Sequence, residues 1–475
     1  MKETSMTVRT RFSPSPTGYI HLGNARAALF SALFALKNQG VFILRIEDTD
    51  ATRSDEQYVE DLQQDLKWLG VIWQEGPGAP GQVGPYWQSQ RQDIYAKFYQ
   101  QLEEKKIIYP CFCSDQTLAM ARKLQISRSQ APRYSGVCKP LSSAEIADKL
   151  AQGLKPAWRF GVPANESIVF VDLVKGPQHF ESNDIGDFIV RRADGTAPFL
   201  FCNAVDDAAM KVTHVLRGED HLANTPRQIL VLKALGLTMP AYGHLSLIVG
   251  EDGAPLSKRH GSFSLSGMRQ DGFLPQAIMN YLARLGHGCD AAGLLDKDQL
   301  AEHFHITKLS RSSARFDMTQ LMYWQKMAVL ALDASALWRW LGEKVQTQVA
   351  ESKQNLFIET VKANMAFPAD GLMWANIFSH DGVHIDAVNY PIIKEAGEQF
   401  FVEAEQAVDQ SGLDLKAVLA DMTQSLGVRG KKLFMPLRVA LTGKTFGPEL
   451  AQVIELLGVQ KVKHRLSKAF KIVAQ

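Results

Sequence analysis

The sequence of 475 residues lacks an apolar, uncharged run long enough to cross a bilayer, which takes about 20 residues. Its opening stretch, MKETSMTVRTRFS, has no apolar core of the kind that a secretory signal carries. Cysteine is scarce, with five residues, and the odd number indicates reduced thiols or metal ligands rather than a disulfide framework. We therefore expect a cytoplasmic protein that is not bound to a membrane.

The chain also lacks a large excess of charge of either sign, because its net charge at pH 7 is +2. Such a balance neither requires nor excludes a nucleic-acid partner. Whether one is indicated depends on where the basic residues cluster. The dinucleotide pattern GxGxxG and a complete P-loop are both absent; TGKT at 442–445 resembles a P-loop tail, but Arg438 stands where the first glycine belongs. With 46% hydrophobic residues, the length predicts roughly three to five domains.

The beginning of the chain has the pattern of a strand, a turn, a helix and a second strand. TVRTRF at 7–12 alternates as a strand does, and SPSPTG then ends it, since proline fixes the backbone and lacks a donor. Apolar residues at helical density follow from Leu22 to Lys37, ended by Gly40, and VFILRIEDTD at 41–50 begins as a buried strand. This order predicts parallel strands and an α/β fold.

Later segments predict that this sheet is interrupted and then resumed. Short segments with Cys, Pro and Gly between about 105 and 200 have the character of an insertion. THVLRGEDHLANTPRQILVLKALGL at 213–237 then predicts a strand and a helix, with Asn224 and Thr225 as possible caps before Pro226. HLSLIVGEDGAPLSKRHGS at 244–262 predicts a strand and a polar loop, and mostly helical periodicity follows from about 265.

Two short motifs favour the binding of a phosphate. His21 and Gly23 stand where the rigid turn meets the helix, and a helix N-terminus favours an anion. Lys258 and Arg259 lie in a polar loop, where two cations could neutralise a leaving pyrophosphate. Taken singly, the first motif is more often a surface histidine in an ordinary turn, and the second is more often a solvated basic surface.

Taken together with several longer segments, these motifs resemble a known family. RFSPSPTGYIHLGNARAALF, RIEDTD, VDD at 205–207, LRGEDHLANTPRQ and LSKRHG occur in the order found in bacterial glutamyl-tRNA synthetases, which are class I aminoacyl-tRNA synthetases. The resemblance covers nearly the whole chain. It is strong through residue 330 and looser afterwards, where FMPLRVALTG at 434–443 still matches.

The resemblance implies a fold and a set of domains. A Rossmann-like, parallel-sheet catalytic domain would be formed by residues 1–115 and 203–252, around an inserted acceptor-stem-binding domain at 116–202. A stem-contact domain that carries the Ser-Lys-Arg loop would follow at 253–330, and an all-α anticodon-binding region would occupy 331–475. We expect a monomer.

The implied activity is the ATP- and Mg²⁺-dependent activation of L-glutamate to glutamyl-adenylate, followed by transfer to the 3′ end of tRNA(Glu). No covalent enzyme intermediate is expected, so catalysis would rest on positioning and charge stabilisation. His21 and Lys258 would be the catalytic pair. The ATP-binding residues implied by the resemblance are Pro14, Ser15, Gly18, His21, Gly23, Asn24, Ser257, Lys258 and Arg259.

The resemblance also implies a glutamate pocket, made by Arg11, Ser13, Ser15, Glu47, Phe199, Asn203 and Arg217. Glu47 would accept the ammonium group. Arg217 would select a side-chain carboxylate over an amide, because a guanidinium binds a carboxylate through two hydrogen bonds. The alternative for Arg217 is an ion pair with Glu219 or Asp220.

Three positions depart from the pattern of the family. Phe199 stands where many relatives have a pocket tyrosine, so one hydroxyl contact would be missing. Pro255 replaces the first lysine of the second signature, so Lys258 and Arg259 alone would neutralise the pyrophosphate. Asn24 ends the first signature, at a position that varies.

Some bacterial relatives hold a structural zinc ion in the insertion. The corresponding ligands here would be Cys111, Cys113, Tyr134 and Cys138, since thiolates suit Zn²⁺ and a closed site takes four ligands. Three buried, reduced cysteines are the alternative. Cys202 and Cys289 are interpreted as isolated thiols.

Basic residues gather near the end of the chain, in VRGKKLFMPLR and KVKHRLSKAFK. Such stripes suit contacts with tRNA phosphates, although they also occur as solubilising helix faces. The arginine that helps some relatives to reject the glutamine anticodon is not evident around VKANMAFPADG, so an enzyme that also charges tRNA(Gln) remains an alternative.

Three further alternatives are disfavoured. The intact His21, Glu47, Arg217 and Lys258 argue against an inactive RNA-binding pseudo-synthetase. Arg217 and the helical C-terminal region argue against a glutaminyl-tRNA synthetase. The residues after about 330 argue against a tRNA-modifying paralogue that lacks an anticodon-binding half.

Overall fold

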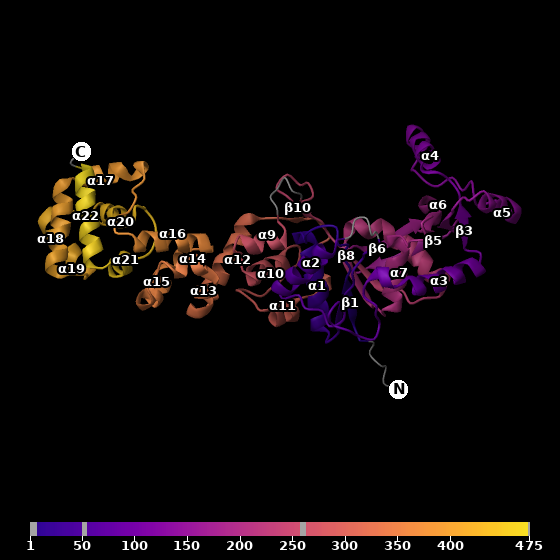
Figure 1. Ribbon diagram of the computed structural model, residues 1–475, viewed down its shortest axis with the longest axis horizontal. Helices are drawn as coiled ribbons and strands as arrows, with labels where there is room; N and C mark the ends of the chain where they lie inside the picture. Colours follow the sequence, from indigo (N-terminus) through magenta and orange to yellow (C-terminus); the bar gives the residue numbers. More distant parts are fainter. Residues whose placement is uncertain (1–6, 50–54, 257–262, 474–475) are drawn as a thin grey trace. The chain divides into compact units, whose positions relative to one another are not determined.

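The computed structural model describes residues 7–49, 55–256 and 263–473 (Figure 1). The chain divides into two compact units, one made of residues 1–270 and 278–320 and the other of residues 271–277 and 321–475. Among the described residues, no helix is both long and apolar enough to span a membrane.

The first unit is built on parallel strands that come from two distant parts of the chain. β1 (Arg9–Phe12) pairs in parallel with β2 (Val41–Leu44), and β8 (His214–Gly218) pairs in parallel with β9 (Ala241–Leu245). The two pairs meet at β1 and β8, where the backbone N–H of Thr213 donates to the carbonyl of Arg9 at 2.9 Å. The expected parallel, Rossmann-like fold is confirmed.

Five helices accompany these strands: α1 (Leu22–Lys37), α2 (Glu56–Trp68), α3 (Gln92–Glu104), α7 (Phe199–Ala209) and α8 (Thr225–Leu235). The bounds predicted for α1 are confirmed. The chain leaves α1 through Gly40, where a Cβ would lie 2.2 Å from the carbonyl oxygen of Val8, so that only glycine allows β2 to start so close to β1. Asn224 is the N-cap of α8, although its side chain makes no capping hydrogen bond.

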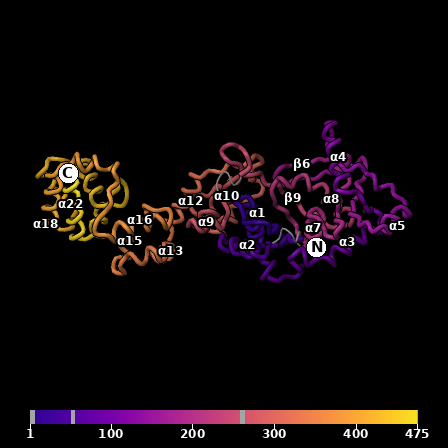
Figure 2. Tube along the Cα trace, turned by 45° about the horizontal axis from the view of Figure 1, so that its top comes forward, coloured from indigo at the N-terminus to yellow at the C-terminus, as the bar shows by residue number. Residues whose placement is uncertain are grey.

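The segment between the two strand pairs forms its own small sheets, as an insertion would. β3 (Ile108–Cys111), β4 (Ala157–Phe160) and β7 (Phe188–Arg191) make an antiparallel sheet, and β5 (Ser167–Asp172) and β6 (Gly176–Glu181) make a hairpin. Its helices are α4 (Asp115–Ser127), α5 (Ser143–Ala151) and α6 (Ser182–Ile185). Figure 2 shows α4 and α5 set apart from α1 and α2.

The hairpin of the insertion returns to the parallel strands. The backbone N–H of Leu173, just after β5, donates to the carbonyl of Tyr242 in β9 at 2.8 Å. This contact brings Asp172, the last residue of β5, against β9. A residue of the insertion therefore lies next to the strands that carry the expected pocket.

Short elements complete the chain between the strands and the second unit. They are β10 (Ile248–Val249), α9 (Leu265–Gln270), α10 (Pro275–Arg284), α11 (Lys297–His303), β11 (Ala314–Arg315) and α12 (Met318–Ala331). β10 pairs in parallel with β11. Short 3₁₀ helices, among them η2 (Glu219–Asn224), connect the larger elements.

The second unit contains helices and no strand among its described residues, which confirms the all-α expectation for the end of the chain. Its helices are α13 (Ala334–Leu341), α14 (Glu343–Gln346), α15 (Gln354–Val361), α16 (Pro368–Ser379), α17 (Tyr390–Ala396), α18 (Glu398–Ser411), α19 (Leu415–Leu426), α20 (Lys431–Thr442), α21 (Leu450–Leu457) and α22 (Val459–Val473).

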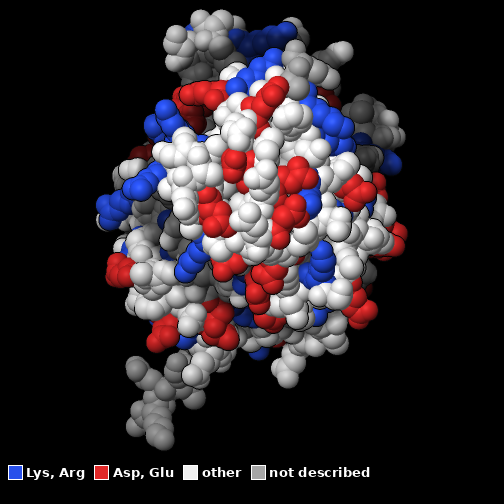
Figure 3. Space-filling view, turned by 90° about the vertical axis from the view of Figure 1, so that its left-hand side faces the viewer, with Lys and Arg blue, Asp and Glu red and all other residues white. Residues whose placement is uncertain are grey.

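The basic stripe expected on α22 is only partly a surface feature. Arg465 is 1% exposed, and its guanidinium donates to the carbonyls of Ile377, His380, Asp381 and Leu441. Lys461 donates to two further carbonyls at the end of α16, and Lys463 pairs with Asp409 at 2.6 Å. The interpretation of Arg465 as a phosphate contact is therefore wrong, because this side chain ties helices together. On the face seen in Figure 3, acidic and basic side chains are interspersed.

Replacing Arg465 by methionine should destabilise the second unit by about 3 kcal/mol or more, because the carbonyls it satisfies would stay buried without a donor. Calorimetry of the full chain should show a lower melting temperature for one transition. Lys471→Ala, at an exposed position of the same helix, is the control and should change stability by less than about 0.5 kcal/mol. Equal effects of the two changes would contradict this role.

Candidate active site

A cavity of about 460 Å³ lies at the carboxyl ends of the parallel strands, where open α/β sheets usually bind ligands. It collects residues that follow β1, β2 and β8 and residues from the starts of α1 and α7. Ten of the residues expected from the sequence line it: Arg11, Ser13, Pro14, Ser15, Gly23, Asn24, Glu47, Phe199, Asn203 and Arg217. The structure thus brings these ten residues together around one cavity.

The two expected catalytic residues are placed differently. His21 is exposed at the start of α1 and does not line the cavity, and neither does Gly18. The backbone of His21 pairs with Ser264, and the N–H of Leu265 donates to the carbonyl of Ile20 at 2.9 Å. Ser257, Lys258 and Arg259 lie outside the described residues. The chain that follows the lysine motif is therefore anchored beside the histidine motif.

One side of the cavity is a buried cluster of charges. Arg45 is fully buried and contacts Asp207 at 2.7 Å, and the Nε of Arg11 approaches the same carboxylate at 3.2 Å. The side-chain oxygen of Asn203 accepts from Arg45 at 3.0 Å, and its amide nitrogen donates to Glu47. Asn203 thereby links the buried cation to the carboxylate that was expected to hold an ammonium group.

Burial acts differently on the two carboxylates of this cluster. It raises the pKa of Glu47 to about 7, because Arg45 and Asn203 only partly offset the loss of solvent. Burial also opposes ionisation of Asp207, but Arg11 and Arg45 together hold the pKa of this carboxyl below its usual value. Asp207 is therefore the permanent counter-ion, while Glu47 keeps capacity for another cation.

Arg217 forms the opposite side of the cavity. It is 5% exposed, and it donates from Nε to His244 at 3.2 Å and from Nη2 to Thr225 and Gln228 at 2.8 and 2.7 Å. Its Nη1 is buried and has no hydrogen-bond partner among the residues that the structure describes. Burial lowers the pKa of Arg217 to about 10, so it remains charged at neutral pH.

The alternative that Arg217 pairs with Glu219 or Asp220 is not supported. Glu219 pairs with Lys175, and Asp220 lies 3.7 Å from the Nε2 of His221. An unpaired N–H on a buried guanidinium is costly unless an acceptor arrives from outside the protein. The geometry of Arg217 is thus that of an anion-binding group.

Several residues of this site were not singled out from the sequence. Arg45 and Asp207 lie inside the quoted segments RIEDTD and VDD, but only their contacts, more than 150 positions apart in the chain, reveal their pairing. His221 lines the cavity with its ring 5.1 Å from that of Phe199. Burial and the charge of Arg217 lower the pKa of His221 to about 4, so this imidazole is neutral at physiological pH.

Comparison with known proteins identifies the family of the chain. The family model described as "tRNA synthetases class I (E and Q), catalytic domain" matches residues 7–323, and the one described as "Anticodon binding domain" matches residues 348–470. The chain belongs to the class I tRNA synthetases of the glutamate and glutamine branch. The resemblance drawn from the sequence motifs is confirmed.

Members of this family with known names cover the whole chain. A protein of Nitrosococcus oceani named glutamate–tRNA ligase 2 is 54% identical over 467 residues, which is 98% of each chain. One of Coxiella burnetii with the same name is 51% identical and covers 97% of this chain and 99% of its own. The crystal structure of a glutamate tRNA ligase from Elizabethkingia meningosepticum, in complex with its amino acid, superimposes with a TM-score of 0.89 at 28% identity, covering 98% and 99% of the two chains.

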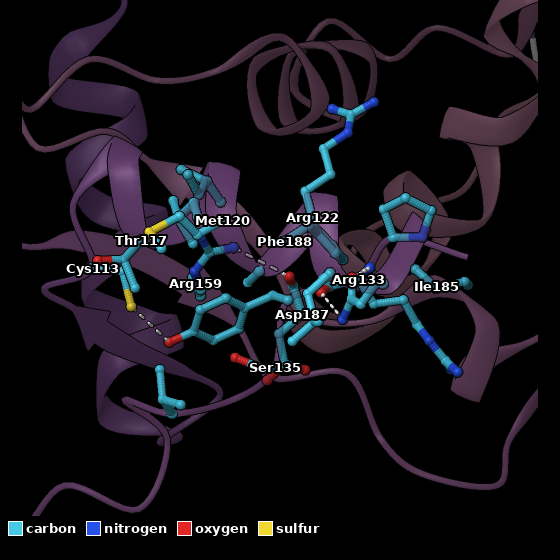
Figure 4. Close-up of a pocket in the computed structure, with 18 of the residues that line it drawn as sticks. Cys113, Thr117, Met120, Arg122, Arg133, Ser135, Arg159, Ile185, Asp187 and Phe188 are labelled. Carbon is cyan, nitrogen blue, oxygen red and sulfur yellow. Dashed lines mark hydrogen bonds between the residues drawn. The ribbon is translucent and has the colours of Figure 1, made fainter. Parts of the chain in front are cut away.

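A second cluster lies in the insertion, at the end of β3. The sulfur atoms of Cys111, Cys113 and Cys138 all lie within 4.8 Å of one another. The hydroxyl of Tyr134 is 3.4 Å from the sulfur of Cys111 and 3.6 Å from that of Cys113, the contact drawn as a dashed line in Figure 4. Three thiols that converge in this way are compatible with a structural zinc site, and the hydroxyl of Tyr134 is the neighbouring group expected as the fourth ligand.

A groove of about 1270 Å³ lies beside this cluster (Figure 4). Its apolar lining includes Met120, Leu124, Val137 and Phe188, and Met120 is 72% exposed. Its cationic lining is Arg122, Lys123, Arg133, Arg159, Arg192 and Arg227. Apolar surface next to several cations suits a polyanion that also carries flat, apolar groups.

The raised pKa of Glu47 predicts a pH-dependent gain of stability in Glu47→Gln. At pH 8 this carboxyl is ionised in the folded and in the unfolded state, and the folded state carries the cost of burying the charge. The shift from 4.5 to about 7 corresponds to about 3 kcal/mol, which vanishes as pH falls below 4.5, where both states are neutral. Urea unfolding should therefore favour the variant clearly at pH 8 and much less at pH 5.

Glu75→Gln is a control of opposite sign. Hydrogen bonds from Arg9 lower the pKa of Glu75, so its ionised form stabilises the fold at pH 8 and the variant should lose stability there. If Glu47→Gln had the same effect at both pH values, the elevated pKa of Glu47 would be refuted.

Proposed function

We propose that the protein is a glutamate–tRNA ligase, which activates L-glutamate with ATP and Mg²⁺ and transfers the glutamyl group to the 3′ end of tRNA(Glu). The observation that carries the proposal is the buried guanidinium of Arg217, which lines the cavity with its Nη1 unpaired among the described residues. A side-chain carboxylate would accept from Nη1 and also neutralise the buried charge, which a neutral amide cannot do. The names of the relatives support the same substrate.

In this proposal the amino acid lies across the cavity. Its ammonium group binds at Glu47, and Arg217 takes the side-chain carboxylate. Arg11, Ser13, Ser15 and Asn203 complete the pocket, and Phe199 contributes an apolar wall without a hydroxyl. The two charged walls thus match the two charged ends of glutamate that do not react, which leaves the α-carboxylate free for attack on ATP.

ATP would lie along the first turn of α1. Pro14, Ser15, Gly23 and Asn24 line that side of the cavity, and the helix N-terminus favours the phosphates. We assign His21 and Gly18 to the approach of the triphosphate, and Ser257, Lys258 and Arg259 to the stabilisation of the departing pyrophosphate. Mg²⁺ would arrive with the nucleotide and neutralise its phosphates. Because no covalent enzyme intermediate is required, these residues act by holding the reactants in line.

The tRNA would be bound by residues of both compact units. We assign the inserted segment at 116–202 to the acceptor end, because its groove combines cations with exposed apolar residues. Residues 253–330 would contact the stem, and the helices at 331–475 would bind the anticodon, as the matching family model suggests. The catalytic domain would comprise 1–115 and 203–252. We further propose that the protein works as a cytoplasmic monomer.

Aminoacylation of purified tRNAs tests this proposal. With ATP, Mg²⁺ and labelled glutamate, the protein should charge tRNA(Glu), and labelled glutamine should give no product. tRNA(Gln) is assayed in parallel with glutamate, because charging of this tRNA would identify an enzyme that does not discriminate between the two. Pyrophosphate release without tRNA is measured as well. Failure to charge either tRNA, with a folded protein, would refute the assignment.

Arg217→Cys tests whether the guanidinium of Arg217 binds the side-chain carboxylate of glutamate. Removing the guanidinium should raise the KM for glutamate by a factor of about 100, since a buried charged contact is worth about 2–3 kcal/mol, and should raise the relative use of glutamine. Lys233→Cys, at an exposed position of α8, should leave both parameters unchanged. An unchanged preference in Arg217→Cys would remove this residue from selection of the amino acid.

We also propose that Cys111, Cys113, Cys138 and Tyr134 hold a structural zinc ion. Elemental analysis of protein purified without chelators should find about one zinc ion per chain. Cys138→Ser should lose most of this zinc and lower the melting temperature, whereas Cys289→Ser should retain it. Wild-type protein without zinc would instead support three reduced cysteines.

A further inference from the structure

A chain of buried hydrogen bonds reaches Arg217 from the insertion. Asp172 and His244 are both fully shielded from solvent, and the carboxylate Oδ2 of Asp172 lies 2.5 Å from the Nδ1 of His244. On the other side of the imidazole, Nε2 lies 3.2 Å from the Nε of Arg217. The three side chains come from β5, β9 and β8, respectively.

The chemistry of the two neighbours fixes the state of the imidazole. The Nε of Arg217 can only donate, so the Nε2 of His244 must accept. The carboxylate of Asp172 can only accept, so Nδ1 must carry the proton. A neutral imidazole with its hydrogen on Nδ1 is therefore the one form that satisfies both contacts, and burial, which lowers the pKa of His244, favours this neutral form.

Asp172 is itself held rigidly. Its other oxygen, Oδ1, accepts from the backbone N–H groups of Val174, Lys175 and His244 at 2.9, 2.7 and 3.2 Å. The carboxylate therefore cannot turn without breaking these contacts. Thr225 completes the arrangement, with its hydroxyl 3.0 Å from the Nε2 of His244 and 2.8 Å from the Nη2 of Arg217.

We propose that His244 and Asp172 are positioning residues for the selection of glutamate: Asp172 fixes the tautomer of His244, and His244 holds Arg217 with its Nη1 unpaired among the described residues. This inference rests on the proposed function, because it concerns the same amino-acid site. It assigns to a residue of the insertion a part in amino-acid recognition, although that residue has no place in the cavity lining.

Fixing the guanidinium in this way serves selection as well as affinity. Nε and Nη2 are committed to His244, Thr225 and Gln228, so Nη1 is the nitrogen left for the ligand. A guanidinium free to rotate could turn toward the oxygen of an amide instead. Rejection of the amide depends on the guanidinium staying where it is.

Asp172→Asn is the sharpest test, because it changes one atom and keeps the shape. The asparagine oxygen would keep the three backbone contacts, which forces its NH₂ group to face the Nδ1 of His244. The imidazole must then carry its hydrogen on Nε2, opposite the Nε–H of Arg217, so that two donors meet. We expect the KM for glutamate to rise tenfold or more, with kcat changed less than threefold and the KM for ATP unchanged.

A change in the KM for glutamate without a change in kcat or in the KM for ATP distinguishes a positioning role from a general loss of structure. The side-chain carboxylate does not react, so its contacts act equally in the ground state and the transition state and appear in KM alone. The ratio of kcat/KM for glutamate over glutamine should fall as well. Loss of kcat with unchanged KM, or equal loss for glutamate and ATP, would overturn the inference.

A double-mutant cycle shows whether Asp172 acts through His244. In the background of His244→Ala, adding Asp172→Asn should change the KM for glutamate less than twofold, because the intermediary is already absent. Additive effects would mean that Asp172 supports the fold independently, and would overturn the inference. His214→Ala removes an imidazole from the same strand as Arg217 but outside the cavity, and should leave all parameters within twofold.

Assays of the wild-type protein distinguish failure of the proposed function from failure of the positioning role of Asp172 and His244. If it fails to charge tRNA(Glu), the proposed function is wrong. If it charges tRNA(Glu) normally and Asp172→Asn, folded to the same melting temperature within a few degrees, keeps the wild-type KM for glutamate, only the positioning role is wrong.

Discussion

The ion pairs that Asp207 makes with Arg11 and Arg45 are the constraint on which the rest of the site depends. Arg11 belongs to β1, Arg45 follows β2, and Asp207 lies in α7, after the whole insertion. A fully buried guanidinium such as that of Arg45 is tolerated only if it is paired, and removing a partner costs several kcal/mol. The pairing therefore forces the two halves of the parallel fold into one arrangement.

This constraint also prepares the pocket for a charged ligand. Arg45 and Arg11 lie closest to Asp207 and lower its pKa, whereas Glu47 is 3.8 Å from Arg45 and keeps a raised pKa in a nearly dry site. A carboxylate in that condition gains more from an incoming cation than an exposed one does, because water does not compete. Burying the ionised carboxylate of Glu47 lowers the free energy of unfolding. An ammonium group bound beside this carboxylate would offset that cost, so the cost favours binding.

Much of this could be predicted from the sequence, and the exceptions have physical reasons. The strand and helix around SPSPTG follow from local patterns, and the bounds of α1 were correct because an apolar run, a rigid turn and a glycine specify them locally. The residues that line the cavity were found because motifs keep their spacing. Arg45, Asp207 and His244 were missed because their importance lies in partners that are distant along the chain. The prediction that Arg465 contacts phosphate was wrong for the same reason, since the carbonyls that accept its hydrogen bonds come from the ends of α16 and α20.

The two sides of the cavity solve opposite problems of charge. On one side the carboxylate of Glu47 has only a 3.8 Å contact with Arg45, longer than the 2.7 Å contact of Asp207, so a cation of the ligand can still stabilise it. On the other side Arg217 is kept short of anions: Glu219 is occupied by Lys175, and Asp172 is separated from the guanidinium by the neutral ring of His244. Had Asp172 contacted Arg217 directly, the pair would have neutralised itself and left no charge for a ligand carboxylate. His244 is fixed by Asp172 and in turn fixes Arg217, while it keeps the carboxylate of Asp172 away from the guanidinium. The guanidinium is therefore held in place, and its charge is still available to a carboxylate of the ligand.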